Sequence, residues 1–192
     1  LTSLYGYARE TVGFALAIDG RVHSPSSGPG TIAALPVDSE LLGGTGKLET
    51  TVSDEAVLAA ARRLRIVPAG DGVSVSAVYK AARGGNDSAQ QLLSERGRVL
   101  GQSVALLRDI LNPDEVIVGG QAFTEYPEVM NDVETAFLDR STLSKRDIRV
   151  TAFGNRVQEA GAGVVSLGGL FADPLGAMRR ASARRSETSA LA

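Results

Sequence analysis

The residues with the clearest potential for binding chemistry are a pair of glycines, Gly119 and Gly120, directly after the apolar run Glu115–Val118. A short β-branched run of this kind is typical of a buried strand. Open α/β sheets bind ligands at the carboxyl edges of their strands, where glycine allows a close approach of the backbone. A tight exit from the strand would also require glycine, so the pattern leaves both a ligand loop and a plain turn open.

Residues that could form a catalytic or metal centre are sparse. The single histidine, His23, follows a short predicted strand and is expected to be an exposed residue without a catalytic role. No spacing in the chain pairs a nucleophile with a base, or two carboxylates with each other, so we expect no catalytic residues and no enzyme activity. Cysteine is absent, which excludes disulfides and thiolate zinc sites. We therefore expect neither a metal nor a cofactor.

The composition is that of an ordinary soluble globular protein, with 43% hydrophobic and 22% charged residues in a chain of 192. A net charge of −2 gives no reason to expect this body to bind nucleic acid by itself. No apolar run approaches the roughly 20 residues that span a bilayer, so we expect no membrane contact. The absence of cysteine suits the reducing cytosol, so we expect a cytoplasmic location. The chain begins with Leu1 rather than methionine, as a piece of a longer protein would.

One long predicted helix, Asn86–Leu111, leads into the strand and the glycine pair. Its first residues can accept hydrogen bonds from free backbone N–H groups, and Asn112-Pro113 ends it because proline lacks the N–H. Apolar residues recur along it at three-and-four spacing, interrupted once by Arg96 and Gly97. This helix and the strand after it form the unit on which the other elements must pack.

The other predicted elements are shorter. They are strands at residues 4–8, 12–18, 21–23 and 148–153, a hairpin turn at Asp19-Gly20, and helices that start at Ser53, cover Val75–Ala82 and begin near Pro127. The glycine-rich segment Val157–Phe171 is interpreted as a helix packed closely on a neighbour. Residues 175–192, biased toward Arg, Ser and Ala, predict a disordered tail after a lobe that covers residues 1–174.

The stretch LLRDILNPDEVIVGG, Leu106–Gly120, resembles the C-terminal half of the ROK family of sugar kinases and transcriptional repressors. In that family a long helix runs into N-P-x-x-[IV]-[IV]-[LIV]-G-G, and the likeness extends from about Val12 to Leu170. The resemblance implies an α/β fold: one actin-like (ribonuclease H-like) lobe with a mixed sheet and flanking helices.

The phosphate loop of the family is poorly preserved. It reads roughly G-T-G-I-G-A-G and corresponds here to Arg9–Ala15, where one glycine remains. Glu10 places negative charge where phosphate would lie, which opposes binding of a nucleotide. The resemblance therefore does not imply that this chain binds ATP.

The sugar and zinc motifs of the family have also changed. The sugar motif resembles E-x-G-H-x-x-V and falls on residues 31–37, so Thr31 replaces the glutamate and Ala34 replaces the histidine. The zinc loop resembles C-x-C-G-x-x-G-C-L-E and falls on residues 40–49, where its cysteines are replaced by Glu40, Leu42 and Lys47. A zinc site of the family type is therefore excluded. Glu49 keeps the glutamate at the position of the family's second sugar-binding glutamate.

The ligand-binding residues implied by the resemblance and by the glycine pair are Thr31, Glu49, Gly119 and Gly120, for a small sugar or sugar-phosphate effector. Glu49 has lost its partners from the family site. This loss favours a plainer role, in which Glu49 caps or forms a salt bridge in front of the helix that begins at Ser53.

The function implied is the regulatory and dimerisation domain of a ROK-type transcriptional regulator, with a DNA-binding helix-turn-helix upstream and outside this chain. Homodimerisation is expected because the long helix carries adjacent apolar pairs, Leu92-Leu93, Leu106-Leu107 and Ile110-Leu111, that widen its apolar stripe toward a second surface. The alternatives are the C-terminal lobe of a ROK sugar kinase and a scaffold that dimerises without a ligand.

Overall fold

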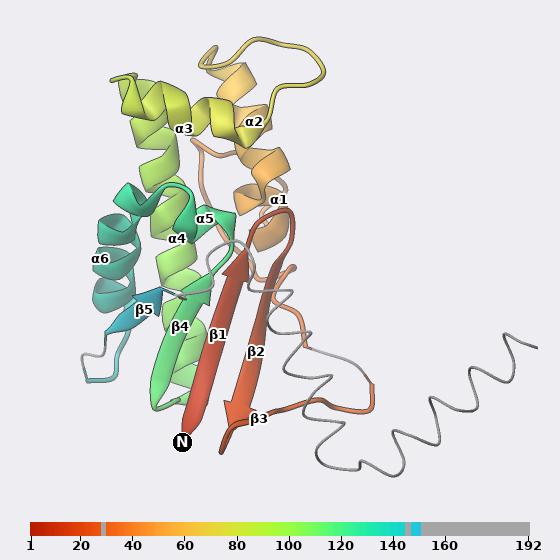
Figure 1. Cartoon of the computed structure of the whole chain (residues 1–192), viewed down its shortest axis with the longest axis vertical. Helices are drawn as coiled ribbons and strands as arrows, with labels where there is room; N and C mark the ends of the chain where they lie inside the picture. Colours follow the sequence, from red (N-terminus) through yellow and green to blue (C-terminus); the bar gives the residue numbers. More distant parts are fainter. Residues whose placement is uncertain (28–29, 145–146, 151–192) are drawn as a thin grey trace, which may run out of the picture. The chain divides into compact units, whose positions relative to one another are not determined.

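β1 (Thr2–Ala8) is the central strand of a five-stranded mixed sheet with the order β3-β2-β1-β4-β5 (Figure 1). On one side it pairs antiparallel with β2 (Val12–Ile18), which pairs antiparallel with β3 (Arg21–Val22). On the other side it pairs parallel with β4 (Glu115–Gly119), which pairs parallel with β5 (Ile148–Val150). The carboxyl ends of β1 and β4 therefore meet at the same edge of the sheet.

The computed structural model describes residues 1–27, 30–144 and 147–150, all of which belong to one compact unit. The strands that the sequence predicts within these residues are present, and the strand after residue 147 is described over Ile148–Val150. The predicted helix at Val157–Phe171 and the predicted tail at 175–192 lie outside the described residues.

The turn between β2 and β3 has the geometry that its sequence predicts. Asp19 and Gly20 have φ angles of 48° and 75°, both in the left-handed region that a two-residue hairpin of this type needs. The Asp19 N–H also donates a 2.8 Å hydrogen bond to the Leu1 carbonyl. The turn thus holds the start of β1 as well as the hairpin.

Six α-helices and one 3-10 helix lie within the described residues. They are α1 (Leu48–Val52), α2 (Asp54–Arg63), α3 (Val75–Arg83), α4 (Asp87–Leu111), α5 (Gln121–Thr124), η1 (Pro127–Val129) and α6 (Met130–Arg140). The four helices that the sequence predicts here are confirmed. The sequence pattern misses α1 and α5, because five and four residues are too few to show a helical period.

The long helix α4 has the ends that the sequence predicts. Asn86 accepts a 2.9 Å hydrogen bond from the Ala89 N–H, and Asn112 takes a left-handed conformation before Pro113. The middle of α4 packs on the sheet face that carries Leu4, Gly6, Val116 and Val118 (Figure 1). At Gly6, an added Cβ atom would lie 3.7 Å from the Val104 methyl group of α4.

The interruption in the apolar pattern of α4 is buried rather than exposed. Arg96 is 1% exposed, and Gly97 is also buried. η1 and α6 pack along α4 so closely that a Cβ atom on Gly97 would lie 2.5 Å from the Val129 side chain of η1. A Cβ atom on Gly101, one turn further along, would overlap the backbone carbonyl of Val133. The two glycines therefore bring α6 onto α4, which the apolar period alone does not predict.

No helix within the described residues is both long enough and apolar enough to cross a membrane.

Candidate functional site

The residues predicted to bind a ligand lie around the turn between β1 and β2, at the carboxyl edge of the sheet. Gly119 is the last residue of β4 and pairs with Tyr7 of β1. Gly120 approaches Ala8, the last residue of β1, and Ala8 pairs with Val12, the first residue of β2. Thr31 and Glu49 reach the same turn through the contacts described next.

Glu49 lies in the first turn of α1 and is half-buried. Its carboxylate accepts a 3.1 Å hydrogen bond from the Val12 N–H, and its own N–H donates to the Ala33 carbonyl at 3.0 Å. The cap of α2 is Ser53, whose hydroxyl oxygen accepts a 3.2 Å hydrogen bond from the Ala56 N–H. Glu49 therefore neither caps α2 nor forms any described ion pair; it ties the start of β2 to α1.

Thr31 is exposed, and its hydroxyl oxygen accepts a 3.1 Å hydrogen bond from the Ala33 N–H. Since the Ala33 carbonyl accepts from Glu49, the segment from Thr31 to Ala33 lies beside the N-terminus of α1. The structure thus brings Thr31 and Glu49 together through one intervening residue.

Gly120 has a structural reason to be glycine. Its φ angle is 92°, and a Cβ atom at this position would overlap the backbone carbonyl of Ala8. Both Gly119 and Gly120 are buried. The close approach of two strand ends is sufficient to explain this glycine.

Arg9 is a site residue that the sequence pattern misses. Its Nε atom donates to the Gln121 side-chain oxygen at 3.0 Å, and its carbonyl accepts from the Asp54 N–H at 3.0 Å. Its guanidinium also lies against Tyr7; burial raises the pKa of the Tyr7 phenol, and the charge of Arg9 opposes that rise. In the sequence, Arg9 stands only where the phosphate loop of the family has a glycine. Its partners, residues 54 and 121, are too distant in the chain for a local sequence pattern to reveal these contacts.

The chemistry open to this edge is hydrogen bonding. The polar groups around the turn include the Glu49 carboxylate, which already accepts a backbone N–H, the Arg9 guanidinium and the exposed side chains of Glu10, Thr11 and Thr31. Within the described residues, no three His, Cys, Asp or Glu side chains are grouped to hold a metal ion. The arrangement can bind a polar ligand, but it offers no general base paired with a nucleophile.

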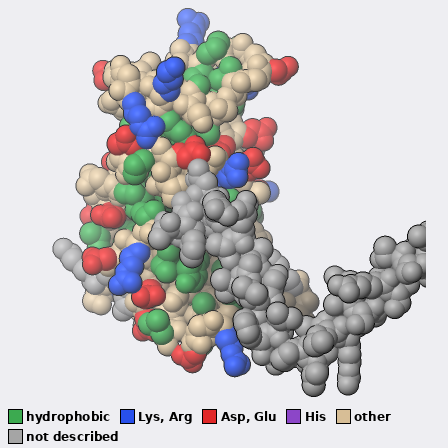
Figure 2. Space-filling model, in the orientation of Figure 1, with side chains coloured by type: hydrophobic (Ala, Val, Ile, Leu, Met, Phe, Trp, Pro, Cys, Tyr) green, Lys and Arg blue, Asp and Glu red, His purple; other side chains and the backbone are tan. Residues whose placement is uncertain are grey.

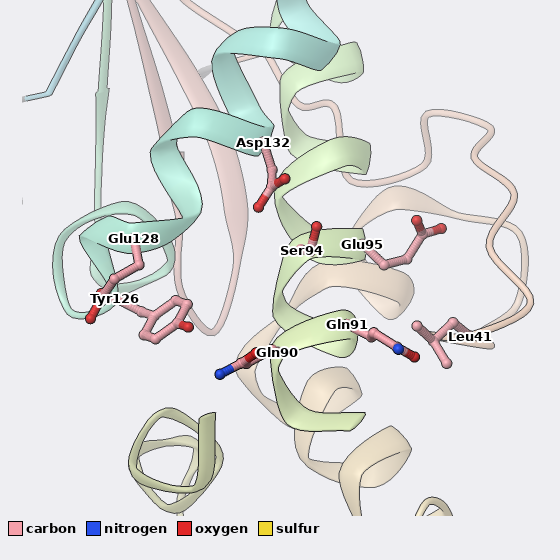
Figure 3. Close-up of a pocket in the computed structure, with 8 residues that line it drawn as sticks. All are labelled: Leu41, Gln90, Gln91, Ser94, Glu95, Tyr126, Glu128 and Asp132. Carbon is pink, nitrogen blue, oxygen red and sulfur yellow. The ribbon is translucent and has the colours of Figure 1, made fainter. Parts of the chain in front are cut away.

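A separate groove of about 520 Å³ lies over the N-terminal half of α4 (Figure 3). It is lined by Leu41, Gln90, Gln91, Ser94, Glu95, Tyr126, Glu128 and Asp132. Figure 3 shows Tyr126, Glu128 and Asp132 on one side of α4 and Leu41 on the other. None of the predicted ligand residues lines this groove.

Two of the carboxylates in the groove are held by arginines. Arg98 donates to Glu95, and Arg83 donates to Glu128; each of these hydrogen bonds lowers the pKa of the carboxyl group. The ring of Tyr126 stacks on the ring of Tyr79, with the centroids 5.8 Å apart. The sequence pattern gives no signal for this groove, because its α4 residues lie on what looks like an ordinary polar helix face.

A mixed sheet covered by a long crossing helix, with further helices beyond it, defines an actin-like lobe of the sugar-kinase type. A family model described as "ROK family" matches residues 4–167, which is most of the chain. The chain therefore belongs to the ROK family.

The similar proteins agree with this assignment. Transcriptional regulator Rv0485 of Mycobacterium tuberculosis is 68% identical over 190 residues, which cover 95% of this chain and 43% of that protein. The chain thus spans less than half the length of this relative.

Two solved structures show the same fold. One is a ROK family transcriptional regulator, a homologue of the Escherichia coli Mlc protein, with a TM-score of 0.64 and 23% identity over 78% of this chain and 41% of that chain. The other is a ROK family protein from Streptococcus pneumoniae in complex with sucrose, with a TM-score of 0.70 and 17% identity over 87% of this chain and 58% of that chain.

Proposed function

We propose that this chain is the regulatory and dimerisation domain of a ROK-type transcriptional regulator, whose DNA contacts are made by a helix-turn-helix domain outside these residues. The observation that carries the proposal is the 68% identity to a mycobacterial transcriptional regulator over almost the whole chain. Such a role would place the parent protein in the cytoplasm.

The charge pattern supports a separate DNA-binding domain. On the face drawn in Figure 2, Lys and Arg side chains alternate with Asp and Glu side chains over the described elements. A surface that binds the phosphate backbone would instead concentrate its positive charge.

The proposed effector is a small sugar or sugar-phosphate, bound at the edge that carries Thr31, Glu49 and the Gly119-Gly120 turn. Three features support this choice: the carboxyl edge of the sheet, the contacts that hold Thr31 beside Glu49, and the sucrose complex of the Streptococcus pneumoniae protein. Arg9 adds a positive charge to the same edge, which would suit a phosphorylated sugar.

A direct test is DNA binding by the full-length protein, measured by fluorescence anisotropy on fragments from its own promoter region. We expect sequence-specific binding that a sugar or sugar-phosphate changes by about 5-fold or more, the range of ordinary allosteric coupling. The matched control is the 192-residue chain alone, which should not bind the same DNA. Specific DNA binding by the chain alone would contradict the proposal that a separate domain binds DNA. If no sugar changes DNA binding, the alternative of a scaffold that dimerises without a ligand would be favoured.

The second candidate function is a sugar kinase lobe, favoured only by family membership. Arg9 and Glu10 occupy phosphate-loop positions, and both the Arg9 carbonyl and the Val12 N–H are engaged within the protein. We predict no phosphoryl transfer when the full-length protein is assayed with ATP and a panel of hexoses. Turnover of even about 1 per second, the slow end of ordinary enzymes, would show that the kinase alternative is correct.

A further inference from the structure

Arg96 of α4 is a buried arginine whose three nitrogen atoms all have partners. It is 1% exposed; its Nε donates to the Val52 carbonyl at 2.7 Å and its Nη1 to the Tyr79 hydroxyl at 3.0 Å. Its Nη2 forms a 2.7 Å salt bridge with the Asp54 carboxylate. The guanidinium fork therefore holds the last residue of α1 and the first residue of α2 at the same time.

The junction between α1 and α2 in turn holds the turn between β1 and β2. The Asp54 N–H donates to the Arg9 carbonyl at 3.0 Å, on the first residue of that turn. At the other end of α1, the Glu49 carboxylate accepts from the Val12 N–H, on the residue that follows the turn. The turn is thus bound at one end by α1, through Glu49, and at the other end by the first residue of α2, Asp54; these are the two helices that Arg96 links.

Lysine could not make the same three contacts. Its single ammonium group can replace one of the donors, but it has no planar fork that reaches a carbonyl, a phenol and a carboxylate together. The Asp54 carboxylate is largely buried, so it needs a charged or strongly polar donor at this place.

We propose that Arg96 is a positioning residue for the candidate effector site: it sets the α1–α2 junction, and through Asp54 and Glu49 it sets the β1–β2 turn. The role of Arg96 at the effector site rests on the proposed function. The hydrogen bonds of Arg96, Asp54 and Glu49 themselves do not depend on an effector.

Arg108 provides a matched control on the same helix. It is also 1% exposed, but it donates to Asp109, Ser141 and the Ser144 carbonyl at the opposite end of α4. The backbone amide that reports on this second network is Thr142 N–H, which donates to Asp109 at 2.8 Å. Arg96→Lys and Arg108→Lys therefore make the same chemical change at equal burial, with different neighbours.

The experiment is hydrogen–deuterium exchange of the full-length protein, read by mass spectrometry on peptides that cover residues 9–14, 50–56 and 139–144. For Arg96→Lys we expect exchange at residues 12 and 54 to become roughly tenfold faster or more, with residue 142 unchanged, as in a local opening. For Arg108→Lys we expect the reverse pattern. Equal acceleration at all three places, or acceleration at 12 and 54 no greater than in Arg108→Lys, would overturn the proposal.

Asp54→Asn is the second variant, in case Arg96→Lys does not fold. It removes the salt bridge but keeps the N–H that donates to Arg9, so faster exchange at residue 12 would support positioning through Arg96. Unchanged exchange at residue 12 would count against it. Because this readout needs neither DNA nor sugar, failure of the positioning role is distinguishable from failure of the regulator function.

Discussion

Glu49 and Asp109 are two carboxylates whose oxygens are occupied by the protein's own donors. Glu49 accepts from one backbone N–H. Asp109 accepts from the Ser141 hydroxyl, from the N–H and the hydroxyl of Thr142, and from Arg108. The two carboxylates lead to two separate predictions.

For Asp109→Asn we expect a pH-dependent loss of stability. Burial acts to raise the pKa of Asp109, but hydrogen bonds from Ser141, Thr142 and Arg108 outweigh it and lower the pKa from 3.8 to about 2. A lowered pKa in the folded state means that the stabilisation is complete above about pH 4 and is lost as the pH falls through 2. Urea unfolding at pH 7 and at pH 2.5 should therefore show a clearly smaller difference from wild type at the lower pH, which lies between the two pKa values, where much but not all of the stabilisation is lost. An equal difference at both would contradict the argument.

For Glu49→Ala we expect a loss of the sugar response with the fold retained. The variant loses one hydrogen bond to the protein, at a cost of about 1 kcal/mol. Thermal unfolding of the full-length protein checks the fold, and DNA-binding anisotropy with and without sugar checks the response. Glu10→Ala, an exposed carboxylate on the same turn, is the control and should respond normally. If Glu49→Ala unfolds the protein instead, its role is structural.

At the scale of residues, local chemistry was predictable and long-range partners were not. The sequence predicts a cap at Ser53 and another at Asn86 or Asp87, because a cap bonds an N–H group two or three residues away, and the structure shows Ser53 and Asn86 as the caps. Arg96 looked like a break in an apolar stripe, because its partners lie 17 to 44 residues earlier in the chain. The contact from Glu49 to Val12 was likewise beyond any sequence spacing.

At the scale of elements, the contact between α4 and α6 depends on two glycines that are not equivalent. Above Gly97 the nearest atom is a methyl group of Val129 in η1, a buried β-branched side chain with a restricted rotamer. Above Gly101 the nearest atoms belong to the backbone of Val133, which cannot move without shifting α6. An alanine at Gly97 must therefore displace a buried side chain, whereas an alanine at Gly101 must displace backbone.

We expect Gly101→Ala to destabilise the protein by roughly 1–3 kcal/mol, as overpacking does, although alanine favours the helix. Gly97→Ala should also destabilise the protein, but by less than Gly101→Ala, because a side chain rather than the backbone must shift and alanine favours the helix. Chemical denaturation of both variants measures the difference. A Gly101→Ala variant as stable as Gly97→Ala would show that α6 adapts more easily than its backbone contacts imply.

The long elements were predicted well because many residues contribute to their periodic pattern. The 25 residues of α4 give a clear period, two caps and a proline stop. By contrast, α1 and α5 have too few residues for a period, yet they hold Glu49 and Gln121 at the candidate site. The sequence could therefore assign the candidate residues to one edge of the sheet, whereas the hydrogen bonds among them could not be predicted.

At the scale of the whole molecule, the dimer surface remains a proposal. Leu92, Leu93 and Leu107 of α4 are buried within the chain, so those residues are not available to a partner. Ile110 is 69% exposed at the C-terminal end of α4, between the half-buried residues Leu106 and Leu111. This end of the helix is the part of the predicted apolar stripe that a second copy could still cover.

We expect the full-length protein to be a dimer by light scattering at micromolar concentration, and Ile110→Lys to shift it toward monomer. A lysine at such an exposed position should alter the stability of the monomer by no more than about 0.5 kcal/mol. Leu138→Lys on α6, 41% exposed in the structure, is the control and should remain dimeric. A wild-type monomer would reject the dimer, and a dimeric Ile110→Lys variant would place the interface elsewhere.

The parallel pairing of β1 with β4 also has a consequence for how the chain folds. Thr2 and Asp114, which bond to each other at the start of this pair, are 112 residues apart in sequence. Contacts of such high separation slow folding, whereas α4 and the β1–β2 hairpin are made of local contacts. During synthesis β1 leaves the ribosome long before β4 exists, so one edge of the hairpin stays unpaired until residue 119 is added. A chain interrupted before that point would expose a central strand, which makes it prone to aggregation.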